Sequence, residues 1–204
     1  NPSRIIKKKV ENCCEIINTL ASPISSRVRS LIKLLRIHQW AKNSLMFLPL
    51  ILSHNLLNLS LIKHSFITFL AFSFVASAMY IINDTLDLFD DRSHPEKKYR
   101  PLASGDVSVF HGLVVCFILL SMALLLALSF YLEMVLLIYL CIYVAVNLTY
   151  TFYLKKIIYL DVFVLSSFYV IRVALGAAVL GLQQSPWLLS FAFLFFLSLS
   201  FAKR

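Results

Sequence analysis

Three aspartates in the segment NDTLDLFDD, residues 83–91, have a spacing that suits a metal site. Asp84, Asp87 and Asp91 follow one another at intervals of three and four residues, so a continuous helix would place them on one face. Like charges on one stripe repel each other, and Mg²⁺ relieves that repulsion while keeping positions for phosphate oxygens. The pattern therefore predicts a Mg²⁺ site. The alternatives are an ordinary solvated loop, or aspartates paired with the lysines downstream.

A cationic segment, RSHPEKKYRPLASG, follows these aspartates directly. The planar fork of arginine and the point charge of lysine are the usual protein ligands of phosphate. An acidic metal face followed by a basic loop would hold a phosphorylated substrate. The candidate phosphate ligands of this loop are Arg92, Lys97, Lys98 and Arg100.

The composition requires that this site be positioned by membrane helices. The chain has 204 residues, of which 60% are hydrophobic and only 14% charged, with a mean hydropathy of +0.83. Soluble domains carry about a quarter charged residues. Apolar stretches long enough to cross a bilayer predict an all-α, polytopic helical membrane protein with six spans, at about 41–58, 64–83, 108–130, 134–153, 160–181 and 186–202.

The basic residues predict the orientation of these spans. Seventeen of the nineteen lysines and arginines fall in the N-terminal segment up to Lys42, after spans 2 and 4, and after span 6, whereas Lys63 falls in the opposite set. Cytoplasmic segments of membrane proteins are enriched in these residues. We expect both termini in the cytoplasm, in a bacterial cytoplasmic membrane. The net charge of +9 is then explained by topology, and no nucleic-acid partner is expected.

Residues 1–40 form a basic lead-in before the predicted transmembrane domain, 41–204. Its second half has apolar residues at helical spacing between arginines and lysines, which suits an anionic membrane surface with Trp40 as an anchor. A linker that follows a soluble domain is an equal alternative. The chain starts with Asn1 and has no signal-peptide pattern, so we expect a fragment or a processed product.

A buried charge marks the fifth span. Arg172 lies eleven residues after Asp161, roughly 16 Å deeper along a helix, and is too far from it to pair. A charge at that depth needs a polar cavity or a partner. We expect an acid from another span or a bound phosphate. The alternative is a structural ion pair with the aspartate cluster.

The acidic motif resembles the NDxxDxxxD motif of the UbiA superfamily of intramembrane prenyltransferases, with Asn83 in the first position. The segments DRSHPEKKYRPLASG and HQWAKNSLMFLPL are similar to the branch that contains decaprenyl-phosphate phosphoribosyltransferase. The resemblance implies Mg²⁺ as cofactor, with catalysis by Asp84, Asp87 and Asp91. It also implies a substrate site lined by Asn83, Asn147, Tyr150, Lys155 and Arg172, although Tyr150 and Lys155 also fit an interfacial aromatic residue and a topogenic charge.

The resemblance implies transfer at the cytoplasmic face, and in the phosphoribosyltransferase-like version a polyprenyl phosphate receives the phosphoribosyl group of phosphoribosyl diphosphate. The same metal face would also serve prenyl transfer from a polyprenyl diphosphate to an aromatic or other acceptor. A catalytically degenerate membrane subunit or a transporter is the alternative of another class. UbiA-type enzymes usually have nine spans and a second polar motif, and this chain stops at FAKR, where that motif would begin.

Overall fold

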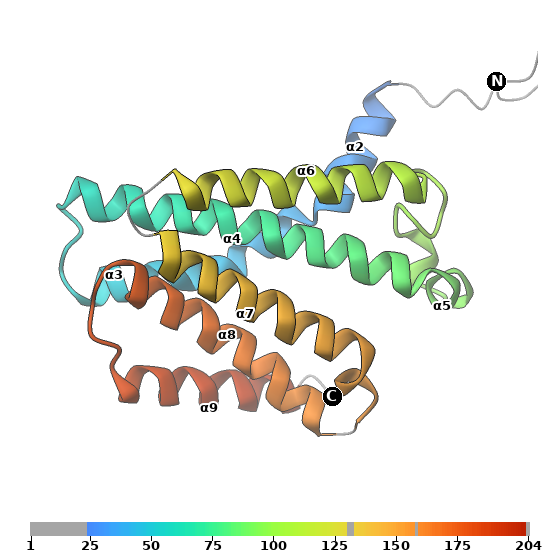
Figure 1. Cartoon of the computed structure of the whole chain (residues 1–204). Helices are drawn as coiled ribbons and strands as arrows, with labels where there is room; N and C mark the ends of the chain where they lie inside the picture. The colour runs from blue at the N-terminus through green and yellow to red at the C-terminus, as the bar shows by residue number, and fades with distance from the viewer. Residues whose placement is uncertain (1–23, 130–132, 158, 203–204) are drawn as a thin grey trace, which may run out of the picture.

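Four long apolar helices form the body of the molecule (Figure 1). The computed structural model describes residues 24–129, 133–157 and 159–202. All four helices are long and apolar enough to cross a membrane, which confirms the predicted helical membrane protein. They are α4 (Leu59–Leu86), α6 (Val109–Leu128), α7 (Glu133–Phe152) and α8 (Leu160–Val179), close to predicted spans 2 to 5. The last predicted span is α9 (Pro186–Ala202), with 17 residues.

The first predicted span, 41–58, has a different form and position. It consists of a 3₁₀ helix, η1 (Ile37–Phe47), followed by the short helix α3 (Leu48–Leu52). The helix ends at Leu52 because the chain turns there, with His54 in the left-handed region at φ 56°. A 3₁₀ helix rises about 2.0 Å per residue against about 1.5 Å in an α-helix, so these 11 and 5 residues extend roughly 30 Å, the thickness of a hydrocarbon core.

Local sequence signals set where the long helices begin. The Asn58 side chain caps α4 by accepting hydrogen bonds from the backbone N–H groups of Ser60 (3.1 Å) and Leu61 (3.4 Å). Ser108 caps α6 in the same way, through the N–H of His111 at 3.3 Å. These polar residues satisfy amide groups that a helix start leaves without partners.

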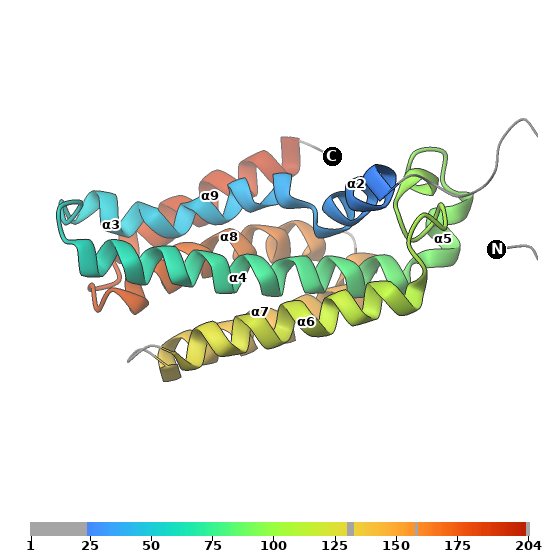
Figure 2. The same cartoon turned by 90° about the horizontal axis from the view of Figure 1, so that it is seen from above.

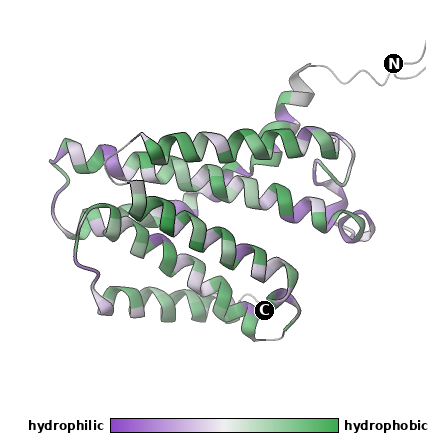
Figure 3. Cartoon of the chain, viewed as in Figure 1, coloured by the Kyte–Doolittle hydropathy of each residue, from purple (hydrophilic) through white to green (hydrophobic). Residues whose placement is uncertain are grey.

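The helices α4 and α8 lie at the centre of the bundle. In their most apolar windows 61% and 56% of residues are buried, against 22% in both α6 and α7. The segment η1–α3 runs alongside α4 and contacts α8 (Figure 2). Gly176 of α8 makes this approach possible, because an added Cβ would lie 2.2 Å from the carbonyl oxygen of Met46. Apolar residues cover most of α6 (Figure 3), as expected for a helix that faces lipid.

One end of the bundle carries the polar elements. These are α2 (Ile24–Leu35), α5 (Leu88–Ser93), η2 (Lys97–Tyr99) and η3 (Leu154–Lys156). Helix α2 corresponds to the predicted amphipathic part of the lead-in: Leu34 is buried, and Val28 and Ile32 are exposed. The remaining lead-in residues, 1–23, lie outside the described part of the chain.

Candidate functional site

The acidic motif lies where α4 ends at this polar end of the bundle. Helix α4 continues to Leu86, so the expected extension of span 2 into the loop is present. The helix then breaks at Asp87 (φ −89°, ψ 12°), and α5 starts at Leu88. Asp84 therefore belongs to α4 and Asp91 to α5, on either side of a change in chain direction.

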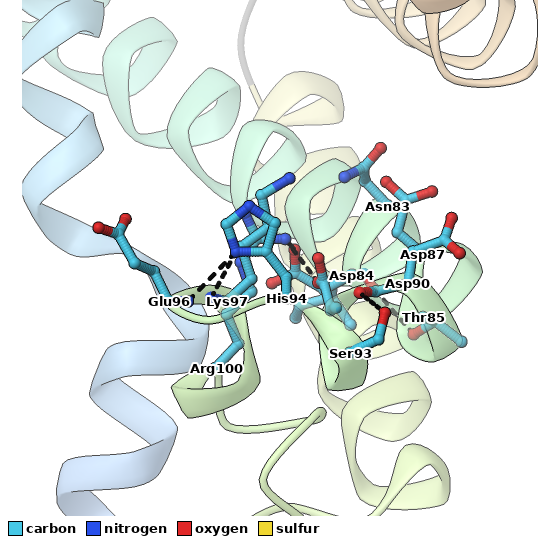
Figure 4. Close-up of polar contacts among 12 residues, drawn as sticks. Asn83, Asp84, Thr85, Asp87, Asp90, Ser93, His94, Glu96, Lys97 and Arg100 are labelled. Carbon is cyan, nitrogen blue, oxygen red and sulfur yellow. Dashed lines mark hydrogen bonds and ion pairs between the residues drawn. The ribbon is translucent and has the colours of Figure 1, made fainter.

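This break separates the three carboxylates that we expected on one face. Asp84 and Asp91 are buried, at 3% and 2% exposure, whereas Asp87 pairs with Lys155 of η3, with Nζ 2.5 Å from Oδ1. Asn83 and Asp87 point away from Arg100 (Figure 4). Among the described residues no group of three or more His, Cys, Asp or Glu side chains is placed to hold a metal ion. The prediction of one continuous stripe assumed an unbroken helix, but the helix is interrupted at Asp87.

Arg100 joins the two buried carboxylates, and Arg36 holds one of them. Nη1 of Arg100 lies 3.1 Å from Oδ1 of Asp84 and 2.6 Å from Oδ2 of Asp91. Nη2 of Arg36, from the start of η1, donates to both oxygens of Asp84 at 2.6 and 2.8 Å. The alternative of aspartates paired with downstream lysines describes the contact of Asp87 with Lys155, whereas Asp84 and Asp91 pair with arginines.

The same geometry tests the fit of Mg²⁺. Carboxylates of Asp84 and Asp91 converge on one nitrogen of Arg100, so both can reach a single cation at that point. Mg²⁺ is commonly held by one or two carboxylates together with substrate phosphates and water. The residues therefore fit a two-carboxylate Mg²⁺ site completed by a phosphorylated ligand. Asp87 is turned toward Lys155 and lies outside that pair.

A cavity of about 180 Å³ lies beside the acidic motif, between α4, α7, α8 and η1. Four residues predicted to contact substrate line it: Asn83, Asn147, Tyr150 and Arg172. The lining also includes Arg36, Lys42, Tyr80, Tyr143 and Tyr169, which were not among the predicted site residues. The cavity therefore combines cations with phenol and amide groups, a lining suited to an anionic and hydroxylated ligand.

Neutral partners hold Arg172 in the cavity wall. Its side chain is 4% exposed, Nε donates to Oδ1 of Asn43 at 2.8 Å, and Nη1 donates to the carbonyl oxygen of Phe168 at 2.6 Å. Its guanidinium also lies over the rings of Phe72 (5.3 Å) and Tyr169 (5.4 Å). The expected acid, and the alternative ion pair with the aspartate cluster, are both absent from its contacts in the described residues. Neutral oxygens and aromatic faces stabilise the charge instead.

The four cations predicted in the loop after α4 have different positions. Arg100 reaches the two buried aspartates, as described above. Arg92, Lys97 and Lys98 are exposed and line no wall of the cavity. Nε of Arg92 donates to the carbonyl oxygen of Ala103 at 3.3 Å, and Nζ of Lys98 lies 5.2 Å from the ring centre of Tyr99. The fold therefore brings one of these four residues to the acidic motif and leaves three at the surface.

Lys155 joins the site from the end of α7. Lys155 contacts Asp87, and the nearby Thr151 donates to Oδ1 of Asn83 at 3.3 Å. These two contacts connect α7 and η3 to the end of α4, 68 residues earlier in the chain. The segment from Asn147 to Lys155 thus borders both the cavity and the acidic motif.

Sequence reasoning missed Arg36, Lys42 and Asn43. All three belong to the stretch RIHQWAKN, in which the two cations were counted as charges that set topology. Asn43 is 1% exposed, accepts from Arg172 and donates from Nδ2 to Oγ of Ser73 at 2.9 Å. The available signal was three polar residues at the start of an apolar span, where each is costly to bury without a partner.

Comparison with known proteins identifies the family. The model of the UbiA prenyltransferase family matches residues 46–204. The chain belongs to the UbiA prenyltransferase family. This confirms the resemblance drawn from the acidic motif, and the UbiA assignment covers every element from the end of η1 onward.

Three relatives place this UbiA chain among longer proteins. It is 40% identical to the protein y4nM of Sinorhizobium fredii over 92% of this chain and 36% of that protein. It is 32% identical to the nodulation protein NoeC of Azorhizobium caulinodans over 83% and 54%. It is 34% identical to decaprenyl-phosphate phosphoribosyltransferase of Corynebacterium glutamicum over 84% and 52%. The chain thus spans about half, or less, of the length of these relatives.

The fold agrees with solved UbiA structures. A UbiA homolog from Archaeoglobus fulgidus, bound to DMAPP and Mg²⁺, superposes with a TM-score of 0.65 at 20% identity, over 82% of this chain and 60% of that one. At this identity the match shows the shared fold.

Proposed function

We propose that the protein containing this chain is a Mg²⁺-dependent membrane transferase that acts on a polyprenyl phosphate or diphosphate. The observation that carries the proposal is that a pair of buried carboxylates lies next to a cavity whose wall contains cations. Two buried carboxylates, Asp84 and Asp91, converge next to a cavity whose wall contains Arg36, Lys42 and Arg172. Carboxylates that fit Mg²⁺, beside cations that fit phosphate, form a site for a metal-bound phosphorylated substrate.

The specific reaction we propose is phosphoribosyl transfer from phosphoribosyl diphosphate to a polyprenyl phosphate. A phosphate oxygen of the lipid forms a bond to C1 of the ribose, and the bond from C1 to the diphosphate breaks with both electrons leaving on the diphosphate. Mg²⁺, when bound, would offset the negative charge on that leaving group. Asp84 and Asp91 would hold it, while Arg36, Lys42 and Lys155 would bind phosphate oxygens and Asn83, Asn147 and Tyr150 would orient the sugar.

Two considerations support this reaction. Curated relatives named decaprenyl-phosphate phosphoribosyltransferase match 83–84% of the chain at 32–34% identity. The polar cavity wall, rich in amides and phenols, also suits a sugar phosphate with several hydroxyl groups.

Prenyl transfer from a polyprenyl diphosphate to an aromatic or other acceptor is the second candidate. It is favoured by the Mg²⁺-bound UbiA homologs that hold DMAPP or GPP. Aromatic rings in the cavity wall, among them Tyr80, Tyr143 and Phe168, would stack against an allylic or aromatic group. A degenerate subunit or transporter is the non-enzymatic rival.

We further propose a bacterial cytoplasmic membrane with both termini in the cytoplasm. The acidic motif, η2 and η3 share the polar end of the bundle, which would face the cytoplasm, where phosphorylated metabolites are available. Residues 1–40 would serve as a lead-in or linker at the membrane surface, and residues 41–204 as the first part of the UbiA-type transmembrane domain.

The test is a product analysis on the full-length native protein, purified in detergent. Incubation with Mg²⁺, decaprenyl phosphate and phosphoribosyl diphosphate should yield a phosphoribosylated lipid by mass spectrometry, and EDTA should abolish it. A prenylated acceptor from decaprenyl diphosphate and 4-hydroxybenzoate would establish the second candidate. If both products were absent while substrate moved across proteoliposomes without Mg²⁺, a transporter would replace the enzyme.

A further inference from the structure

Arg36 lies between the acidic motif and the cavity and contacts both. Its Nη2 binds the Asp84 carboxylate at 2.6 and 2.8 Å, and its guanidinium carbon lies 4.9 Å from the ring centre of Tyr80. The same side chain lines the cavity together with Lys42. It is 21% exposed, against 4% for the Asp84 side chain, so the arginine has room to move and the carboxylate has little.

The backbone at Arg36 has a conformation that is rare for residues with a side chain. It joins α2 to η1 in the left-handed region (φ 51°, ψ 43°), which residues other than glycine adopt rarely. Such a conformation costs free energy and is retained when surrounding contacts require it. The ion pair with Asp84 and the ring contact with Tyr80 are contacts of that kind.

The site balances its charges without a metal. Asp84 contacts Arg36 and Arg100, Asp91 contacts Arg100, and Asp87 contacts Lys155, so three carboxylates meet three cations. A divalent cation at the point where Asp84 and Asp91 converge takes the position of the Arg100 nitrogen, and it also needs an Asp84 oxygen that Arg36 occupies. The displaced guanidinium would then need another anionic partner, because it remains partly buried.

We propose that Arg36 changes partner during ligand binding. It neutralises Asp84 until Mg²⁺ binds, and it then turns toward the cavity and donates to the substrate phosphate. The fork of a guanidinium can bind either a carboxylate or a phosphate through two hydrogen bonds, so Arg36 can exchange one for the other. Mg²⁺ and phosphate therefore bind with positive coupling, and each raises the affinity for the other by the same factor. This inference rests on the proposed Mg²⁺ and phosphate site.

A purely structural role for Arg36 predicts the opposite sign. If Arg36 only fastens η1 to α4, its removal loosens the Asp84 carboxylate and weakens metal binding. If it competes with the metal, its removal frees that carboxylate and strengthens metal binding. The direction of the change therefore separates the two roles without any measurement of turnover.

The experiment measures Mn²⁺ affinity by electron paramagnetic resonance, with and without inorganic phosphate, on the full-length protein in nanodiscs. Mn²⁺ shares the oxygen ligands of Mg²⁺. We expect phosphate to tighten Mn²⁺ binding to the wild type about tenfold, within the usual range of coupling. Arg36→Gln should bind Mn²⁺ alone about tenfold more tightly and lose the effect of phosphate. Arg29→Gln removes an exposed charge from α2 and should match the wild type.

Each contrary result has its own meaning. Weaker or unchanged Mn²⁺ binding by Arg36→Gln would overturn the exchange of partners. So would a wild-type affinity that ignores phosphate, a result that stands even if the variant does not fold. A wild type that binds no Mn²⁺ would instead overturn the proposed function on which the exchange depends.

Discussion

Two pairs of cations differ in how they relate to the acidic motif. One pair, Arg100 and Lys155, contacts its aspartates, and the other, Lys97 and Lys98, does not. Arg100 and Lys155 are partly buried and contact aspartates of the acidic motif at 2.5 to 3.1 Å. Lys97 and Lys98 lie three and two residues before Arg100, are exposed, and make no ion pair with an acid in the described part of the chain. Nearness in sequence to an acidic motif therefore does not decide which cation contacts it, since Lys155 reaches the motif from η3, 68 residues after Asp87.

Loss of Asp84 is expected to have the largest effect on activity, because two of the cations that contact the motif depend on it. Asp84→Asn keeps the size of the side chain and removes the charge that Arg36 and Arg100 share. We expect lipid transfer by the full-length protein to fall about 10³-fold or more, since metal binding and the placement of both arginines depend on this carboxylate. Membrane insertion, measured by alkaline extraction, should be unchanged. Transfer within a few-fold of the wild type would contradict the assignment of Asp84.

Loss of Lys155 should have an intermediate effect. Lys155→Met keeps the length of the side chain but removes the partner of Asp87. We expect transfer to fall roughly 10- to 100-fold, the usual effect of removing a group that orients a metal or substrate ligand. Lys63→Met, an exposed lysine on α4 in the opposite set of segments, is the matched control. Equal activities of the two variants would place Lys155 with the topogenic charges.

Loss of the exposed lysines should have the smallest effect. The double variant Lys97→Gln/Lys98→Gln removes two charges that the sequence predicted to bind phosphate, but which lie outside the cavity. We expect transfer within about twofold of the wild type, because exposed charges contribute little in solvent. A loss above tenfold, measured as kcat/KM for the phosphorylated substrate, would show that this loop closes onto the site.

The sequence predicted the long helices well because each is a long, mostly apolar run, and two of them begin at a polar cap, Asn58 and Ser108. It predicted four lining residues of the cavity from one motif and its resemblance. It did not predict the break at Asp87, since nothing local forbids a helix there. It also missed Asn43 as the partner of Arg172, because that contact joins residues 129 positions apart.

The 3₁₀ form of η1 constrains the spacing of its residues. Three residues per turn, about 120° per residue, bring every third side chain onto one face, whereas an α-helix turns about 100° per residue. Trp40, Asn43 and Met46 accordingly form one row: Trp40 donates to Ser77, and Asn43 and Met46 are each 1% exposed. Inserting a single residue would rotate everything beyond it by a third of a turn, and Asn43 would no longer meet Arg172. Spacing within this stretch is therefore as constrained as the identity of its residues.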